Sequence, residues 1–406
     1  MRRYFVLLLV FGSALATPFA CTPQVVDAVD PPAETGGEAG VTGTGGTAAG
    51  SGGTAGAAGN AGTAGSGASA GTGTVCPDGG SEGDRDGDGT PDCIDGCDDD
   101  PLKQSSGLCG CGLADTAPEG GVTCADLVGL LAHRYAFNGT GTTVVDSAPG
   151  GNADGDIVNA TLSGQGTLPL AGLLSDEYVG LPNRILSTPA AGAPETGSIT
   201  LEAWLQWTGG PAWQRIFDFG DNDTPQEGQQ GNGGVSYLFL TPRTPNDPAL
   251  TVVAPQNQKL RVAYKRPAGN EYEVTLDAPI ALPSGVVTHV AVVIDGALEQ
   301  MALYVDGELQ EGTAYFRNVG APAFTQMTGV YDWSAPVPTG DGGTVVPPPI
   351  DLTVVNDINN WLGRSQFVAD VELQATYYEF RIYSGALTPE LVAISYKGGP
   401  DAEFLQ

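Results

Sequence analysis

Residues 84–95 carry side-chain oxygens at the spacing of a calcium-binding loop. The segment reads DRDGDGTPDCID. In such a loop, oxygens at positions 1, 3 and 5 converge on a tight turn, a glycine at position 6 permits the bend, and position 12 closes the site. Gly89 stands at position 6 and Asp95 at position 12. We therefore expect calcium as a cofactor, with these ligands: Asp84, Asp86, Asp88, Thr90, Asp92 and Asp95.

The seven cysteines divide into a single early residue and a dense group. The single residue is Cys21. The other six fall within residues 76–124 and are Cys76, Cys93, Cys97, Cys109, Cys111 and Cys124. An even set this close together predicts three disulfides formed in an oxidising compartment. The spacing leaves their pairing open.

The first 21 residues have the pattern of a secretory signal. Arg2 and Arg3 precede an apolar run that is too short to span a bilayer, and small residues follow it. Cleavage before Cys21 would make this residue a lipidated N-terminus, so we expect a lipoprotein of the cell surface or outer membrane. Cleavage after Ala16, with ordinary secretion, is the alternative.

Residues 22–75 consist mainly of Gly, Ala, Thr, Ser and Pro. Such a segment cannot bury enough apolar surface to offset chain entropy, so we expect a disordered spacer. The whole chain carries 47 acidic and 16 basic side chains, a net charge of −31. This balance argues against nucleic-acid binding and against docking on anionic lipid, and it leaves the lipid anchor as the predicted membrane contact.

The motif DRDGDGTPDCIDGCDDDP at residues 84–101 resembles thrombospondin type 3 repeats. It has that family's alternation of Asp and Gly followed by Asp-Cys. The resemblance implies that residues 76–124 form a small calcium-ordered segment braced by disulfides.

Residues 125–406 are typical of a large all-β domain. Short apolar or alternating runs are separated by turns rich in Gly, Pro, Asn and Asp, which indicates an antiparallel β-sandwich or jelly roll. A short helix is expected within residues 124–132, and another over residues 388–396, capped by Thr388 with Pro389 at its first position. The predicted strands are 133–138, 177–181, 198–207, 214–220, 235–241, 259–265, 271–276, 287–295, 300–306, 361–366 and 375–383.

Several of these runs together resemble laminin G-like domains of the concanavalin A-like jelly-roll fold. The segments are HRYAFN at 133–138, SITLEAW at 198–204, QRIFDFG at 214–220, SYLFLTP at 236–242, THVAVV at 288–293, LYVDG at 303–307, NNWLGRS at 359–365 and EFRIY at 379–383. The resemblance implies two packed antiparallel sheets that bind carbohydrate or an extracellular protein, often with one calcium ion. Asn138 and Glu379 stand nearest the positions that ligate this ion in the family.

The same fold also hosts glycoside hydrolases, which need two carboxylates around the scissile bond. Glu271 and Glu273 have a suitable spacing on one strand, as do Asp370 and Glu372, but neither pair has the acidic triple and flanking aromatic residues of those hydrolases. We therefore expect exposed strand carboxylates, structural roles for the two histidines, and no catalysis.

Binding is expected in two long insertions, residues 221–234 and 320–351, because long loops on a rigid scaffold commonly carry recognition. The candidate ligand-binding residues are Tyr331, Asp332, Trp333 and Trp213. The sequence thus predicts a tethered, non-catalytic protein that binds carbohydrate or protein. A glycan-degrading hydrolase and a purely structural cell-envelope protein are the alternatives.

Overall fold

The computed structural model describes residues 83–107, 109–115, 121–187, 197–224, 226–245, 258–267, 272–318, 325–339 and 342–405. The chain divides into two units, residues 1–71 and 72–406, and all described residues belong to the second. The predicted signal, the predicted spacer at 22–75, Cys21, Cys76 and Glu271 lie outside the described residues. Among the described residues, no helix has the length and apolar character that crossing a membrane would require.

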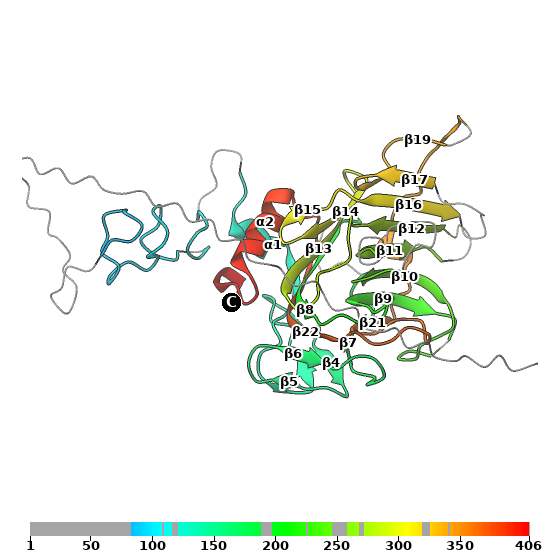
Figure 1. Ribbon diagram of the computed structural model, residues 1–406, viewed down its shortest axis with the longest axis horizontal. Helices are drawn as coiled ribbons and strands as arrows, with labels where there is room; N and C mark the ends of the chain where they lie inside the picture. The colour runs from blue at the N-terminus through cyan, green and yellow to red at the C-terminus, as the bar shows by residue number, and fades with distance from the viewer. Residues whose placement is uncertain are drawn as a thin grey trace, which may run out of the picture. The chain divides into compact units, whose positions relative to one another are not determined.

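Two large sheets form the body of the molecule (Figure 1). The first contains, in spatial order, β1 (Leu131–Tyr135), β22 (Ala375–Tyr383), β8 (Ile199–Trp207), β13 (Val287–Asp295), β14 (Gln300–Val305) and β15 (Glu308–Leu309). Two short strands extend it: β6 (Leu168–Leu170) pairs with β22, and β18 (Tyr331–Asp332) pairs with β14.

The second sheet has ten strands. In spatial order they are β17 (Thr325–Thr328), β16 (Thr313–Asn318), β12 (Tyr272–Asp277), β11 (Arg261–Lys265), β10 (Gly234–Thr241), β9 (Phe217–Asn222), β21 (Asn359–Leu362), β7 (Tyr178–Leu181), β4 (Gly155–Val158) and β3 (Thr143–Val144). Two small ribbons join β2 (Thr140–Gly141) to β5 (Leu162–Ser163) and β19 (Val337–Pro338) to β20 (Thr344–Val345).

Alternation along the strands builds the core between the sheets. Leu201 and Ala203 of β8 pair across with Val292 and Val290 of β13, and all four side chains are buried in one apolar cluster. Phe217 and Phe219 of β9 enter the same cluster from the second sheet. Successive strand residues point to opposite faces, so the side chains between these core residues lie on the outer face of each sheet.

Helices cover the outer face of the first sheet (Figure 1). They are α1 (Cys124–Leu130), α2 (Pro389–Gly398) and the short 3-10 helix η2 (Glu403–Leu405). Thr388 caps α2, since its side chain accepts a hydrogen bond from the backbone nitrogen of Leu391. Leu127 of α1 and Val392 of α2 pack on Val293 of β13 within a second apolar cluster.

The structure confirms the predicted all-β sandwich and the helix that begins after Thr388. The strands at 287–295 and 375–383 have the predicted bounds. Several expected bounds need correction. The strand expected at 133–138 spans Leu131–Tyr135, and the one expected at 361–366 spans Asn359–Leu362. The first helix ends at Leu130, because Leu131 already pairs with Tyr383 in β1, and the strand expected at 214–220 begins only at Phe217. The strands β16 and β17 were not predicted from the sequence.

Candidate functional site

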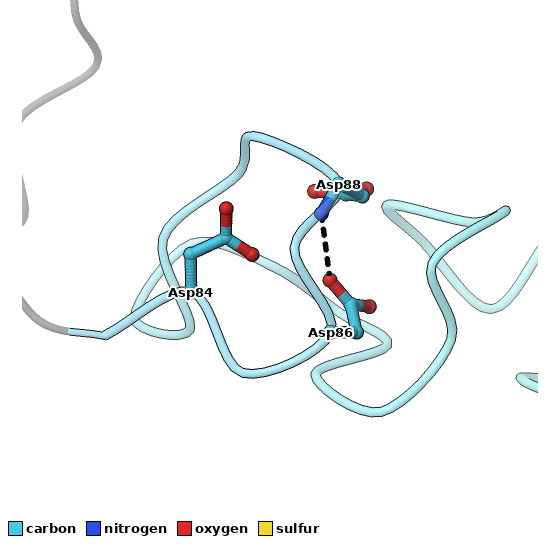
Figure 2. A group of neighbouring side chains, drawn as sticks. All are labelled: Asp84, Asp86 and Asp88. Atoms are coloured by element: carbon cyan, nitrogen blue, oxygen red, sulfur yellow. Dashed lines mark hydrogen bonds between the residues drawn. The ribbon is translucent and has the colours of Figure 1, made fainter.

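The aspartates at the start of the predicted calcium loop lie together. Figure 2 shows the side chains of Asp84, Asp86 and Asp88 on neighbouring turns of this loop. One carboxylate oxygen from each of them lies within 4.8 Å of the other two. Asp84 shapes the turn, because its two carboxylate oxygens accept hydrogen bonds from the backbone nitrogens of Gly87, at 2.7 Å, and Gly89, at 3.0 Å. Both glycines have positive φ, a backbone conformation that other residues adopt at a cost.

The remaining predicted ligands lie in the same segment and make hydrogen bonds within it. Thr90 donates its backbone N–H to Asp88 Oδ1 at 2.7 Å. Asp92 Oδ1 accepts from the backbone nitrogen of Arg85 at 2.8 Å, and Asp95 Oδ1 accepts from that of Cys97 at 2.7 Å. The described structure therefore groups three of the six predicted ligands into one compact set, and the other three support the turns around it.

The chemistry of this loop fits a hard cation. Asp86 Oδ2 and Asp95 Oδ2 are buried and have no hydrogen-bond partner among the described residues. Lost hydration and the charges of Asp88, Asp95 and Asp84 raise the pKa of Asp86, and only the backbone N–H of Asp88 opposes this. Carboxylate oxygens without a donor are unfavourable when buried, whereas a calcium ion would satisfy them.

Disulfides join the acidic segment to the β domain. Cys97 bonds Cys111, and Cys109 bonds Cys124 at the start of α1. Cys93 is disulfide-bonded as well. Two of the pairings that the sequence left open are thereby determined, and Cys109 and Cys124 also enter the apolar cluster beneath the helices.

Two of the aromatic residues predicted for ligand binding, Tyr331 and Trp333, are buried and so offer no surface to a ligand. Tyr331 is 0% exposed and Trp333 is 6% exposed, and both belong to the core cluster. The insertion that carries them folds back on the sandwich: β18 pairs with β14, and the Tyr331 hydroxyl donates to the carbonyl oxygen of Pro348. Asp332 is half-buried and accepts hydrogen bonds from the backbone and side chain of Ser334.

Trp213 is half-buried on the outer face of the second sheet. The guanidinium carbons of Arg215 and Arg261 each lie 5.8 Å from the centre of its ring. Trp213 also packs against the small apolar cluster of Tyr237, Phe239 and Ala263. It is therefore engaged by side chains of the protein itself.

The tentative calcium ligands of the β domain have other partners. Glu379 is fully buried, and its Oε1 accepts hydrogen bonds from Arg134 Nε at 2.8 Å and Arg381 Nε at 2.5 Å. These guanidinium groups lower the pKa of Glu379 although its burial raises it. Asn138 donates from its side chain to Asp401. Glu379 is therefore an ion-pair partner rather than a cation ligand, because both of its oxygens already face positive or N–H groups.

The carboxylates considered for hydrolysis are also engaged. Glu273 pairs with Arg317 at 3.0 Å, and Asp370 pairs with Arg215 at 2.8 Å. Glu372 is buried, and burial raises its pKa. The two histidines lie in packed positions. His133 Nδ1 is 2.8 Å from Asp146 Oδ2, and the centre of the His289 ring is 4.5 Å from that of Trp204, with the two rings tilted.

A groove on the outer face of the second sheet offers a different site. Its volume is about 430 Å³, and β4, β7, β21 and the loop around Glu227 line it. Strand register places Asp156, Gly180 and Trp361 in one row across three strands. Gly180 leaves the middle of this row open, because a Cβ there would have no neighbour closer than 3.9 Å.

Aromatic rings and amides form the walls of the groove. Arg364 stacks on Tyr178 at 4.3 Å and on Trp361 at 4.8 Å, and the two rings meet edge to face at 5.9 Å. The side chain of Asn360 points to the inner face instead, because Asn360 pairs with the core residues Leu181 and Phe219. Asn359 Oδ1 accepts from the backbone nitrogen of Gly228, which joins the loop to β21.

The sequence did not indicate this groove. Its rings come from strands far apart along the chain, and only the pairing of Trp361 with Gly180 brings them together. Taken alone, Trp361 reads as a core residue, and it is in fact nearly buried. Local patterns gave no sign that β7 and β21 are neighbours.

Two antiparallel sheets packed face to face, with an open groove on one outer face, define a β-sandwich of the jelly-roll class. The family model of the concanavalin A-like lectin/glucanases superfamily matches residues 176–341. This match confirms the laminin G-like resemblance over that part of the chain. The comparison with curated proteins gives no match.

Several solved structures are similar to parts of this chain at low sequence identity. Domain 4 of the extracellular GH43 arabinanase AbnA from Geobacillus stearothermophilus, in complex with arabinotriose, is 16% identical, with a TM-score of 0.36 over 68% of this chain and 98% of that one. The CBM40 of Ruminococcus gnavus IT-sialidase, bound to α2,3-sialyllactose, is 16% identical, with a TM-score of 0.32 over 53% and 95%. Trypanosoma rangeli sialidase is 16% identical, with a TM-score of 0.38 over 72% of this chain and only 35% of its own.

Proposed function

We propose that this protein is a secreted, surface-tethered, non-catalytic protein that binds carbohydrate through the groove formed by β4, β7 and β21. Lipidation at Cys21 and the spacer that follows it would hold the β domain away from the membrane. A calcium ion in the acidic loop would stabilise the segment before the β domain.

The observation that carries the proposal is the composition of the groove. Tyr178 presents a half-exposed ring beside Asn359 and the exposed carboxylate of Asp156, in an open channel of about 430 Å³. Ligand sites combine a few fixed polar groups with apolar or aromatic surface. A sugar ring offers the matching chemistry, since its C–H face can stack on an aromatic ring while its hydroxyls bond amides and carboxylates.

The absence of catalysis is part of the proposal. Of the paired carboxylates that the sequence offers for hydrolysis, the three that the structure describes are held by arginines or are buried: Glu273, Asp370 and Glu372. A retaining or inverting hydrolase instead needs two carboxyl groups that face its substrate. Release of reducing ends from any polysaccharide that the purified protein binds would contradict this part.

Calcium would be held by the oxygens of the acidic loop. When bound, it supplies positive charge and oxygen coordination to carboxylates that otherwise repel one another. The residues that would hold it are Asp84, Asp86, Asp88, Thr90, Asp92 and Asp95. The two buried oxygens without partners, Asp86 Oδ2 and Asp95 Oδ2, support this part of the proposal.

A glycan array probed with the full mature chain in calcium tests the binding function. For an oligosaccharide that binds, Tyr178→Ala should weaken binding at least tenfold, because it removes the ring that faces the groove. Tyr315→Ala is the matched control, since Tyr315 is a half-exposed tyrosine on β16, remote in strand order from β7 in the same sheet. A blank array, or equal losses for the two variants, would overturn the proposed site.

Labelling with a palmitate analogue tests the tether separately. Incorporation into the wild-type protein in its host, and none into Cys21→Ser, is the expected result. Equal labelling of the two proteins, or of neither, would contradict lipidation at this residue.

A further inference from the structure

We infer that a second pocket binds a small carboxylic acid with an apolar body, and that Arg243 pairs with its carboxylate. The volume of this pocket is about 400 Å³, which is ordinary for a small-molecule site. Among the described residues, it shares no lining residue with the groove of β4, β7 and β21. The inference therefore does not depend on the carbohydrate-binding function proposed above.

Three segments of the sandwich build most of the pocket: the end of β8, the stretch after β10, and the loop between β12 and β13. Backbone hydrogen bonds hold these segments together. The nitrogen of Leu282 donates to the carbonyl oxygen of Pro242 at 2.9 Å, and the nitrogen of Gly285 donates to that of Trp207 at 2.7 Å. The pocket is thus preformed by the fold.

The walls of the pocket are mainly apolar. The apolar side chains that line it are Trp207, Ile280, Ala281, Leu282 and Pro283. The apolar surface continues along the same loop, because Ile280, Val286 and Val287 are 58%, 50% and 46% exposed. Exposed apolar surface that adjoins a pocket favours a ligand with an apolar body.

Arg243 gives this pocket a positive charge that the described protein does not neutralise. Its guanidinium carbon lies 5.7 Å from the centre of the Trp207 ring, and its Nη2 donates to the carbonyl oxygen of Gly210. Within the described parts of the chain, Arg243 pairs with no carboxylate, and its buried Nε has no hydrogen-bond partner. None of the described lining residues is acidic.

Other enclosed arginines of this protein face carboxylates. Arg215 pairs with Asp218 and Asp370, and Arg381 pairs with Glu379. Arg243 differs, because the space beside it is a pocket. A cation beside apolar walls is unfavourable without an anion, and a ligand carboxylate would supply one through charge-assisted hydrogen bonds.

A single negative charge on the ligand matches the site. Arg243 is the one cation among the described lining residues, so a dianion would bring a second charge without a partner into apolar surroundings. A carboxylate also fits the planar guanidinium group. Gln258 and Ser284 line the pocket as well, and their side chains can donate to the remaining lone pairs of the carboxylate.

Isothermal titration of the full mature chain with three probes tests the inference. The probes are octanoate, octan-1-ol, which has the apolar body without the charge, and acetate, which has the charge without the body. We expect octanoate to bind at least about tenfold more tightly than either, because it alone gains from both the apolar walls and Arg243. No binding of octanoate, or equal binding of octan-1-ol, would overturn the inference.

Arg243→Gln should weaken octanoate binding at least about tenfold, because the charge-assisted hydrogen bonds are lost. Lys397→Gln is the matched control, since it removes one positive charge from an exposed residue of α2 that does not line the pocket. Equal losses for the two variants would assign the attraction to the surface as a whole, and the inference would then be wrong.

Ile280→Ser provides a test that does not depend on the folding of Arg243→Gln. Because Ile280 is largely exposed, this change should leave the melting temperature unchanged and weaken octanoate binding about fivefold through the loss of apolar contact. Unchanged octanoate binding by Ile280→Ser would contradict the inference. Arg243→Gln should bind any glycan of the array as the wild type does, so failure of the pocket and failure of the groove are measured separately.

Discussion

The ammonium nitrogen of Lys103 lies 2.9 Å from Asp115 Oδ1 inside a cage of oxygens. It also donates to the backbone carbonyls of Ser106, Gly110 and Leu113 at 2.7 to 2.9 Å. The side chain of Lys103 is only 10% exposed. The ammonium group of Lys103 thus organises the turns that follow the acidic loop. In the acidic loop itself, the carboxylates of Asp84, Asp86 and Asp88 converge without a lysine or arginine between them.

Replacing Lys103 should therefore disrupt these turns without any change in calcium. In Lys103→Met the carbonyls and Asp115 lose their shared donor, at a cost of about 1–3 kcal/mol. Hydrogen exchange in peptides from residues 97–115 should become faster, while exchange in β13 stays unchanged. Arg85→Gln is the control, because the Arg85–Asp99 pair is exposed and contributes little. Equal effects of the two variants would contradict the role of the cage.

Removing calcium should affect the preceding loop selectively. Chelation leaves the carboxylates of Asp84, Asp86 and Asp88 to repel one another, so residues 84–95 should exchange backbone hydrogens faster. The Lys103 turns and the β domain should keep their protection, because they are held by a lysine and by packed sheets. Asp86→Asn with Asp88→Asn should make exchange in this loop insensitive to the chelator, because two ligands and most of the repulsion are removed together. Identical exchange with and without chelator would remove the predicted site.

The buried carboxyl of Asp218 predicts a pH dependence of stability. Burial raises the pKa of Asp218 to about 7, although Arg215 opposes the shift. The pKa of an aspartate in an unfolded chain is about 3.9. Between about pH 4 and pH 7, the folded state therefore keeps a proton on Asp218 that the unfolded state releases. This contribution to stability is full below about pH 4 and is lost as the pH rises through about 7.

In Asp218→Asn the side chain is an amide, which has no carboxyl proton to release. Between pH 4 and pH 7, the free energy of unfolding of the wild type should therefore fall relative to the variant, by up to about 4 kcal/mol. Urea unfolding at several pH values measures the difference. For Asp146→Asn, the pH dependence of the stability difference should have the opposite sign, because the pKa of Asp146 is lowered in the folded state. Burial alone would raise this pKa, but the hydrogen bonds from His133 and from backbone amides outweigh the effect of burial. Parallel curves for wild type and Asp218→Asn would contradict the prediction.

The ion pairs beneath α2 should be essential for docking of the C-terminal segment. Arg381 is fully buried, and it donates to Glu379, to Ser395 of α2 and to the carbonyl oxygen of Gly399. Arg381→Met leaves Glu379 with one fewer partner in a buried site, at a cost of about 3–5 kcal/mol. Thermal unfolding should show a clear loss of stability, and limited proteolysis should cut near residue 399. Lys397→Met, an exposed change in the last turn of the same helix, should do neither.

Trp333 should matter for stability rather than for recognition. Trp333→Ala removes a large side chain from the core, at a cost of about 3–5 kcal/mol. The conservative Trp333→Phe should fold and retain full affinity for any glycan that the wild type binds. Loss of binding by a folded Trp333→Phe, at unchanged melting temperature, would restore the insertion as a binding surface.

Local patterns predicted the elements best where alternation was strong. Strand β13 was predicted with its observed bounds because Val290, Val292 and Ile294 alternate with residues of the other face. The start of α2 was predicted because Thr388 and Pro389 are local signals at adjacent positions. Strands β16 and β17 were missed, and the burial of Tyr331 was not foreseen, since both depend on which distant strand lies alongside.

By itself, the amino-acid sequence determined the all-β class, the acidic loop with its glycine turns, and the cysteine-rich segment. Each of these depends on residues within a few positions of one another. Only the tertiary structure decided which aromatic residues are buried, that Glu379 is held between two arginines, and that Tyr178 and Trp361 share a groove. Strand pairing between remote segments places these side chains, and spacing along one strand carries no record of its neighbours.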